Sequence, residues 1–214
     1  MRHKHVYTVF VDFSAAYDNV WHSGLLYKLY KVGMSGKIIK LLKGIYENMH
    51  SCVKVKDSCS DRFQPLKGTR QGCIMSPTLF NIHLQDLPCI FREKDCDPIK
   101  VKDKVIGSLL YADDLLILSQ SSTGLQKALG KLAEYCKKWQ LKVNINKTKS
   151  MVFNSRQGRY RFSYENKLIE EATQMKYLGI TFTPSGNFKA CFKHLYNKAH
   201  KSMYLVRKHL QDVN

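Results

Sequence analysis

Features typical of several common protein classes are absent from this sequence. No run of 18 apolar residues exists, so no segment is long and apolar enough to cross a membrane. The apolar stretch near the N-terminus is short and closes at Asp12, so it does not resemble a signal peptide. The seven cysteines include no CxxC pair and leave one over, which argues against a zinc site or a disulfide framework. We therefore expect reduced thiols in an intracellular protein, located in the cytoplasm, the nucleus or both.

Acidic residues are also scarce. The 214 residues contain 35 Lys and Arg but 17 Asp and Glu, which gives a formal net charge of +18. The imbalance is greatest in residues 137–214, which hold 16 of the basic residues but only 4 of the acidic ones. A surplus of this size favours a polyanionic partner. Nucleic acid is the first candidate, and an anionic membrane surface is the second.

The hydrophobic pattern predicts a mixture of helices and short strands. The chain shows no internal repeat, and 44% of its residues are hydrophobic, which is enough for one domain with a core or for a domain and the start of a second. Helical spacing occurs in residues 23–33, 35–49, 76–87 and 123–139 and from 189 to the end, with Ser76 as the expected N-cap of the third helix. Strands are expected at 6–13, 52–57, 62–68, 149–153, 160–164 and 177–182. Residues 92–104 are expected to be loop, and a strand, a turn and a second strand are expected within 109–118. Without regular strand–helix alternation, we expect an α+β fold with helices packed on one face of the sheet.

The segment LLYADDLLIL, residues 109–118, places two adjacent aspartates in an apolar run. At ~4 Å, two like charges repel by roughly 4 kcal/mol at an effective dielectric constant of 20. A hairpin turn would explain the position of both aspartates, because Asp is common in turns. A divalent cation would explain their charge, and it would need a third oxygen ligand. Asp12, at the end of the first predicted strand, is the candidate.

Five segments of the chain resemble the conserved motifs A to E of reverse transcriptases, in the family's order. They are FVDFSAAYDNVWH, GTRQGCIMSPTLFNI, LLYADDLLIL, WQLKVNINKTKSMVF and KYLGITF. The details of the first, second and fourth are similar to the non-LTR (LINE-type) retrotransposon branch. The resemblance runs from residue 6 to about residue 185 and implies a polymerase palm with a small antiparallel sheet.

The resemblance also implies a role for individual residues. Asp12, Asp113 and Asp114 match the catalytic carboxylates and would bind two Mg²⁺ ions, with Mn²⁺ as a possible substitute. The nucleotide-binding positions would be Phe13, Tyr17, Gln71, Gly72 and Lys147. Tyr17 falls at the position where a ring excludes the ribose 2′ hydroxyl, although a tyrosine of the core remains the alternative. Lys147 would lie near the leaving pyrophosphate, but Lys149 is also in this segment and the sequence does not decide between them.

A palm of this kind implies an RNA template, a DNA primer and a deoxynucleoside triphosphate (dNTP) as partners. The implied divisions are a palm at 1–170, a primer-grip hairpin at 171–187 and the start of a thumb helix at 188–214. Because Asp12 lies so near residue 1, the fingers subdomain that normally precedes motif A is not expected in this chain.

Two other functions remain open at this point. A catalytically silent nucleic-acid-binding remnant would keep the basic surface without turnover. A viral RNA-dependent RNA polymerase would also carry an aspartate soon after the first motif A carboxylate, as Asp18 does here. Tyr17 and the YADD sequence argue against that polymerase class, which usually leaves room for the 2′ hydroxyl and reads GDD.

Overall fold

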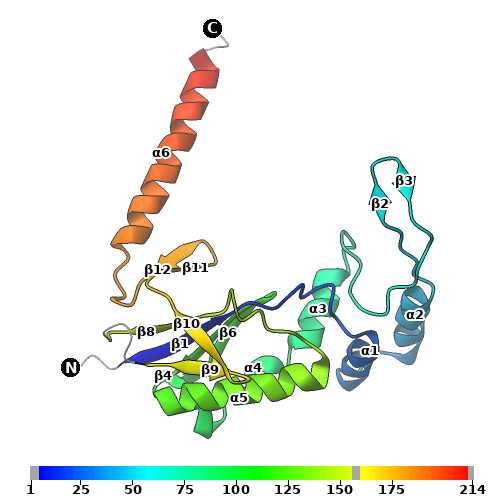
Figure 1. Ribbon diagram of the computed structural model, residues 1–214, viewed down its shortest axis with the longest axis horizontal. Coiled ribbons are helices and arrows are strands. Elements are labelled where there is room, and N and C mark those ends of the chain that lie inside the picture. The colour runs from blue at the N-terminus through cyan, green and yellow to red at the C-terminus, as the bar shows by residue number, and fades with distance from the viewer. Residues whose placement is uncertain (1–4, 156–159, 212–214) are drawn as a thin grey trace.

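A six-stranded sheet forms the centre of the molecule (Figure 1). The computed structural model describes residues 5–155 and 160–211. In spatial order the strands are β6 (Ser108–Tyr111), β7 (Asp114–Ser119), β1 (Val6–Val11), β8 (Lys149–Phe153), β10 (Lys167–Glu171) and β9 (Phe162–Tyr164). Neighbouring strands are antiparallel except β8 and β10, which are parallel. The expected α+β fold is confirmed.

Helices account for most of the remaining regular secondary structure in the described residues. They are α1 (His22–Lys31), α2 (Gly36–Glu47), α3 (Ser76–Leu84), α4 (Leu87–Ile90), the short 3-10 helix η1 (Lys94–Cys96), α5 (Ser122–Trp139) and α6 (Lys189–Gln211). Every helix expected from the hydrophobic spacing is present. Ser121 caps the start of α5, because its hydroxyl accepts a hydrogen bond from the Gly124 amide at 3.1 Å.

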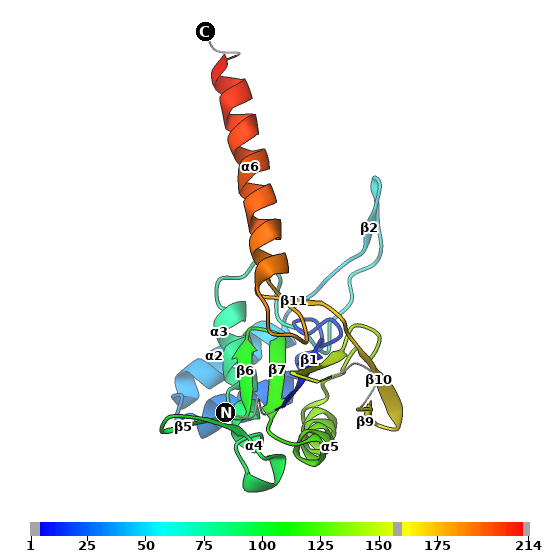
Figure 2. The same ribbon diagram turned by 90° about the vertical axis from the view of Figure 1, so that its left-hand side faces the viewer.

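Three two-stranded hairpins lie outside the sheet. They are β2 (Lys54–Val55) with β3 (Ser58–Cys59), β4 (Ile99–Val101) with β5 (Lys104–Ile106), and β11 (Met175–Tyr177) with β12 (Ile180–Phe182). The β2–β3 hairpin projects from the end of the molecule that α1 and α2 form, and α6 leads away from the sheet (Figures 1 and 2). Residues 212–214 of the expected thumb segment and residues 1–4 and 156–159 of the expected palm lie outside the described part.

Two expectations about the hairpins were wrong. Residues 92–104, expected to be loop, contain η1, β4 and the first residue of β5. The lysines hid the alternation of Ile99 and Val101, and Lys102 takes the left-handed conformation at the turn. Residues 62–68 form no paired strand beyond isolated bridges from Ser51 to Phe63 and from Trp21 to Lys67, because the chain already turns at Lys56 and Asp57.

Three further differences concern local structure. The Ser76 hydroxyl does not cap α3, since it donates to the carbonyl of Arg70 at 2.7 Å. Residues 177–182, expected as one strand, turn at Leu178 and Gly179 to join β11 to β12. Strand β10 was not predicted, because only one of its five side chains, that of Ile169, is buried.

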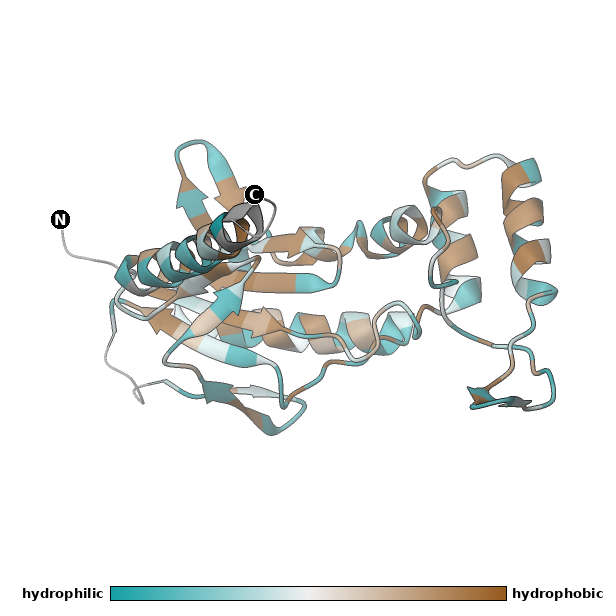
Figure 3. Ribbon diagram, turned by 90° about the horizontal axis from the view of Figure 1, so that it is seen from above, coloured by the Kyte–Doolittle hydropathy of each residue, from teal (hydrophilic) through white to brown (hydrophobic). Residues whose placement is uncertain are grey.

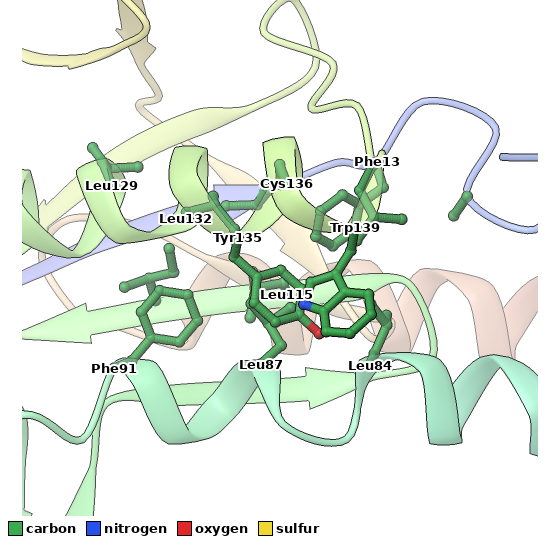
Figure 4. Close-up of a cluster of buried hydrophobic side chains, with 14 of the residues drawn as sticks. Phe13, Leu84, Leu87, Phe91, Leu115, Leu129, Leu132, Tyr135, Cys136 and Trp139 are labelled. Atoms are coloured by element: carbon green, nitrogen blue, oxygen red, sulfur yellow. The ribbon is translucent and has the colours of Figure 1, made fainter. Parts of the chain in front are cut away.

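The two faces of the sheet carry separate hydrophobic clusters. Val9 and Val11 of β1 face the main core, where α5 packs against β1, β7 and β9. Figure 4 shows part of this core, with side chains of α5 packed over those of α3 and α4. Phe10 faces the opposite side and contacts Tyr177 of the β11–β12 hairpin, with ring centroids 5.8 Å apart. The period-2 alternation of β1 therefore places helices on one face and the small hairpin on the other.

Helix α6 is long, basic and largely exposed along its described side chains. The side chains of Phe192, Tyr196 and Tyr204 are exposed on it, together with lysines. Figure 3 shows hydrophilic stretches along its ribbon. Within residues 5–155 and 160–211, no helix has both the length and the apolar character that a bilayer span requires.

A buried lysine joins the helices beneath the sheet. The Lys28 side chain of α1 is 3% exposed, and its ammonium donates to Asp86 Oδ1 and the Tyr135 hydroxyl, both at 2.6 Å, and to the carbonyl of His83. It also lies 3.9 Å from the ring centroid of Trp139. Burial lowers the pKa of Lys28 to about 8, while the Asp86 carboxylate opposes that change. This network connects α1, the α3–α4 junction and α5.

We expect Lys28→Ala to lower the free energy of unfolding by about 2 kcal/mol, because it removes the hydrogen bonds of a buried side chain and its packing on Trp139. Lys40→Ala, at an exposed position of α2, should change it by less than about 0.5 kcal/mol. Urea unfolding followed by circular dichroism measures both. Equal effects of the two substitutions would show that the network contributes little.

A second expectation concerns how the free energy of unfolding changes at low pH. His83 is fully buried, and within the described part of the chain neither ring nitrogen has a hydrogen-bond partner. Burial, followed by the charge of Lys28, lowers its pKa to about 4. The unfolded chain therefore binds the proton more readily, so this residue makes the free energy of unfolding fall as pH drops from about 6.5 to 4. Between about pH 6.5 and about pH 4, His83→Leu should make the free energy of unfolding less dependent on pH. His50→Leu, at an exposed position, should leave the dependence unchanged. A dependence in His83→Leu equal to that of the wild type would contradict this expectation.

Candidate active site

Asp12 and Asp114, two of the predicted catalytic residues, lie at the ends of two neighbouring strands. Strands β1 and β7 are antiparallel, and Val11 pairs with Leu115 at the end of the register. The next position on each strand is Asp12 and Asp114, respectively. Both therefore lie at the same edge of the sheet, as expected from the sequence.

The third carboxylate lies in the turn beside them. Tyr111 of β6 pairs with Asp114 of β7, which leaves Ala112 and Asp113 as a two-residue turn. Ala112 takes the left-handed conformation with φ +52°. The hairpin turn that the sequence offered as one explanation for the paired aspartates is thus present.

Residues 142–148 brace the backbone next to Asp12. The Asp12 amide donates to the hydroxyl of the buried Thr148 at 3.2 Å, and its carbonyl accepts from the Asn144 amide at 2.8 Å. Phe13 bridges to Val143, and its side chain is buried in the main core (Figure 4). Only the backbone of Phe13 is thus available to a nucleotide, and the bracing by Thr148 had no clear signal in the sequence.

Tyr17 is half-buried and stacks on Phe80 of α3, with ring centroids 4.3 Å apart and an interplanar angle of 20°. Burial raises the pKa of Tyr17, and Asp113 and Tyr111 raise it further. Its ring also lines a cavity of about 490 Å³ with Pro77, Asn81, Leu110, Tyr111 and Ala112. The residue is therefore packed on the core and also accessible beside the aspartate turn.

Residues 17–22 and 67–71 form a hydrogen-bonded seam. The Gly68 amide donates to the carbonyl of Val20 at 2.9 Å, and the Thr69 amide donates to the carbonyl of Tyr17 at 2.8 Å. Gly68 has φ +97°, and a Cβ on it would lie 2.9 Å from the carbonyl oxygen of Asp18. Such a close approach requires glycine.

Gln71 and Gly72 lie at the far end of the seam from Gly68. The Gln71 side chain is exposed, and Gly72 takes φ +78° with open space on the side where a Cβ would point. The seam holds these two residues at a fixed place relative to Tyr17. The sequence alone did not predict this pairing.

The two lysines that the sequence could not separate have different surroundings. Lys147 is exposed and lines a cavity of about 230 Å³ together with Asp12 and Asp114. Lys149 instead forms an ion pair with Glu170 of β10, with Nζ 2.6 Å from Oε2. Lys147 is thus the lysine beside the carboxylates.

Tyr177 of β11 also reaches the site, although it was not among the predicted site residues. Its hydroxyl donates to the carbonyl of Asp114 at 3.3 Å and lies 3.4 Å from the carbonyl of Leu109. Burial raises the pKa of Tyr177, and Asp114 adds to the increase. The β11–β12 hairpin is thus attached to both strands of the aspartate hairpin.

Comparison with known proteins identifies this arrangement. The model of the reverse transcriptase (RNA-dependent DNA polymerase) family matches residues 1–182. The chain belongs to this family.

Relatives of this reverse transcriptase domain come from non-LTR retrotransposons, which confirms the branch indicated by the sequence motifs. This chain is 31% identical over 213 residues to the probable RNA-directed DNA polymerase from transposon BS of Drosophila melanogaster. The match covers 94% of this chain and 23% of the relative. The polymerase from the mobile element jockey of the same organism is 30% identical, covering 80% of this chain and 19% of the relative. The chain thus spans about a fifth to a quarter of the length of these curated relatives.

Solved structures share the fold of the domain. Telomerase from Candida tropicalis, in complex with a TWJ fragment of telomeric RNA, superposes with a TM-score of 0.63 at 16% identity. The match covers 87% of this chain and 30% of the telomerase chain. At this identity the likeness establishes the fold and no more.

The carboxylates of the reverse transcriptase domain repel one another. Burial raises the pKa of Asp114, and the charges of Asp113 and Asp12 raise it further. In the described part of the chain, no three His, Cys, Asp or Glu side chains converge into a ready-made metal cluster. Mg²⁺ commonly uses one or two carboxylates and completes its shell with water and substrate phosphates. Asp12 and Asp114, which line one cavity, therefore fit such an ion.

Because of this repulsion, Asp113→Asn should raise the melting temperature of the metal-free chain by about 1–4 °C, from a gain of roughly 0.5–1 kcal/mol. Mg²⁺ or Mn²⁺ should raise the melting temperature of the wild type, and Asp113→Asn should lose that response. Thermal melts with and without the ion measure both effects.

Asp103→Asn is the matched control, because it removes the same charge from the exposed turn of the β4–β5 hairpin. Asp103→Asn should keep the rise in melting temperature that the metal ion causes. Without the ion, its melting temperature should not exceed that of the wild type. A metal response that survives in Asp113→Asn would exclude Asp113 as a ligand.

Proposed function

We propose that this domain is an RNA-directed DNA polymerase, which adds dNTPs to the 3′ hydroxyl of a primer. The observation that carries the proposal is the placement of Asp12 beside Asp113 and Asp114 at one edge of the sheet, within a chain of the reverse transcriptase family.

Asp12, Asp113 and Asp114 would hold the divalent ions that reverse transcriptases use, two Mg²⁺ ions or Mn²⁺ in their place. When bound, such ions lower the pKa of the attacking hydroxyl and stabilise charge on the phosphate oxygens. The bracing of the Asp12 backbone by Thr148 and Asn144 supports this role, because a fixed backbone limits where the carboxylate can lie.

Four residues around the carboxylates would act on the nucleotide. Lys147 would place its ammonium near the pyrophosphate that leaves, as a proton donor or a counter-charge. The Tyr17 ring would exclude a 2′ hydroxyl, and its stacking on Phe80 supports this by limiting how far the ring can retreat. Gln71 would hydrogen-bond the nucleotide, while Gly72 lets the backbone approach it. Phe13 would contribute its backbone alone.

The basic C-terminal third would bind the RNA template and the DNA primer through their phosphates. The exposed lysines of α6 and the surplus of positive charge in residues 137–214 support this assignment. The same surplus favours the second candidate, a protein that binds nucleic acid without turnover.

One experiment separates the two candidates. The wild-type chain should extend a DNA primer on an RNA template with dNTPs and Mg²⁺, and Asp113→Asn should reduce the rate by roughly a hundredfold or more. Binding of the primer–template should stay the same or become slightly stronger in this variant, and it should weaken steeply with salt in both proteins. Electrophoretic mobility shifts and primer extension measure the two properties.

Asp103→Asn serves as the control for the loss of charge and should keep its extension activity. Extension that survives in Asp113→Asn would contradict the proposed chemistry. Salt-dependent binding by a wild-type chain that extends no primer would instead support the silent binding protein.

The role of Tyr17 has its own test. Tyr17→Val should raise the use of ribonucleotides relative to dNTPs by roughly tenfold or more, because the bulk beneath the sugar is lost. Tyr17→Phe keeps the ring and should keep the discrimination. If Tyr17→Val incorporates ribonucleotides no better than the wild type, Tyr17 serves only the core.

A further inference from the structure

The side chain of Gln71 is restrained by one residue across the seam. It is exposed, and a Cβ on Gly72, the next residue, would point into open space. Among the described residues, its only side-chain hydrogen bond runs from Nε2 to Oδ1 of Asp18, at 3.0 Å. Without that bond the long side chain would sample many rotamers, since an exposed glutamine has several free torsions.

The chemistry of this bond selects one orientation of the amide. An ionised carboxylate can only accept hydrogen bonds, so Asp18 binds the NH₂ end of Gln71 and never its carbonyl. The carbonyl oxygen Oε1 and the second N–H then remain available to a ligand. A neutral partner with both a donor and an acceptor would not make this selection.

The position of Asp18 is itself fixed. Its amide donates to the carbonyl of Ala15 at 3.0 Å, and its backbone lies against Gly68 in the seam. In the part of the chain that the structure describes, no lysine or arginine forms an ion pair with it. The carboxylate is therefore free to hold Gln71.

Asp18 and Gln71 also line the same cavity, of about 580 Å³, together with Lys67 and Arg70. The pair is therefore accessible from solvent. The backbone seam connects it to Tyr17, which precedes Asp18 in the chain.

We propose that Asp18 is a positioning residue for the incoming nucleotide, which it serves by holding the amide of Gln71 in a single orientation. This inference rests on the proposed function, because it takes Gln71 as a nucleotide-binding residue. It predicts that Asp18 affects nucleotide affinity only through Gln71.

Nucleotide affinity can be measured without catalysis. A primer that ends in a dideoxynucleotide is bound to the whole chain on an RNA template with Mg²⁺, and a heparin trap is added. The concentration of the correct dNTP that protects the complex from the trap gives its apparent Kd. Asp18→Ala should raise this Kd by roughly three- to tenfold, the range expected for one lost hydrogen bond.

Two further variants test whether Asp18 affects nucleotide affinity through Gln71. Asp18→Asn can still accept from Gln71 but no longer selects one end of the amide, so its Kd should fall between those of the wild type and Asp18→Ala. Adding Asp18→Ala to Gln71→Ala should cause no further loss, because the two residues act as one unit. Asp103→Ala, the matched control, should leave the Kd unchanged.

The possible outcomes separate the inference from the proposed function. Wild-type affinity in Asp18→Ala, or additive losses in the double variant, would overturn the inference alone. A wild-type complex that no dNTP protects would overturn the proposed function and this inference with it.

A spectroscopic measurement tests the contact without any nucleotide. The side-chain amide resonance of Gln71, identified by its loss in Gln71→Ala, should shift in Asp18→Ala and stay in place in Asp103→Ala. An unmoved resonance in Asp18→Ala would show that the two side chains do not interact in solution.

Discussion

The register between β1 and β7 determines where the carboxylates lie. Val11 pairs with Leu115, so Asp12 and Asp114 fall at the same edge of the sheet. A slip of one residue would turn every side chain of β1 to the opposite face, burying Phe10 where Val9 and Val11 now pack. The hydrophobic cores on the two faces therefore hold the site in place, although neither core contains a catalytic group.

Stability and function are concentrated on different parts of the fold. At the carboxylate edge, burial raises the pKa of Asp114, and the charges of Asp113 and Asp12 raise it further. Beneath the sheet, Lys28 is surrounded by acceptors and aromatic rings and connects three helical segments. Contacts in the interior of the fold thus offset the repulsion between the carboxylates.

How much the sequence could predict depends on the range of the interaction. The amphipathic helices and the end of β1 at Asp12 follow from local periodicity, and the paired aspartates follow from charge and apolar flanks. The assignment of Lys147 required the position of β10, because Glu170 of that strand pairs with Lys149. The burial of Phe13 and the contact of Tyr177 with Asp114 depend on segments more than 60 residues away. No local pattern specifies such pairings.

The attachment of Tyr177 also has a mechanical consequence. Helix α6 has 23 residues, which at 1.5 Å per residue makes a rod about 34 Å long. Its base adjoins β12, where Phe182 lies 6.0 Å from Phe188 between ring centroids, and the same hairpin is bonded through Tyr177 to the strands of the aspartate turn. The base of the helix thus rests on a hairpin that is bonded to both strands of the aspartate turn. A displacement of α6 would therefore act on this hairpin and, through the Tyr177 hydroxyl, on the backbone of Asp114.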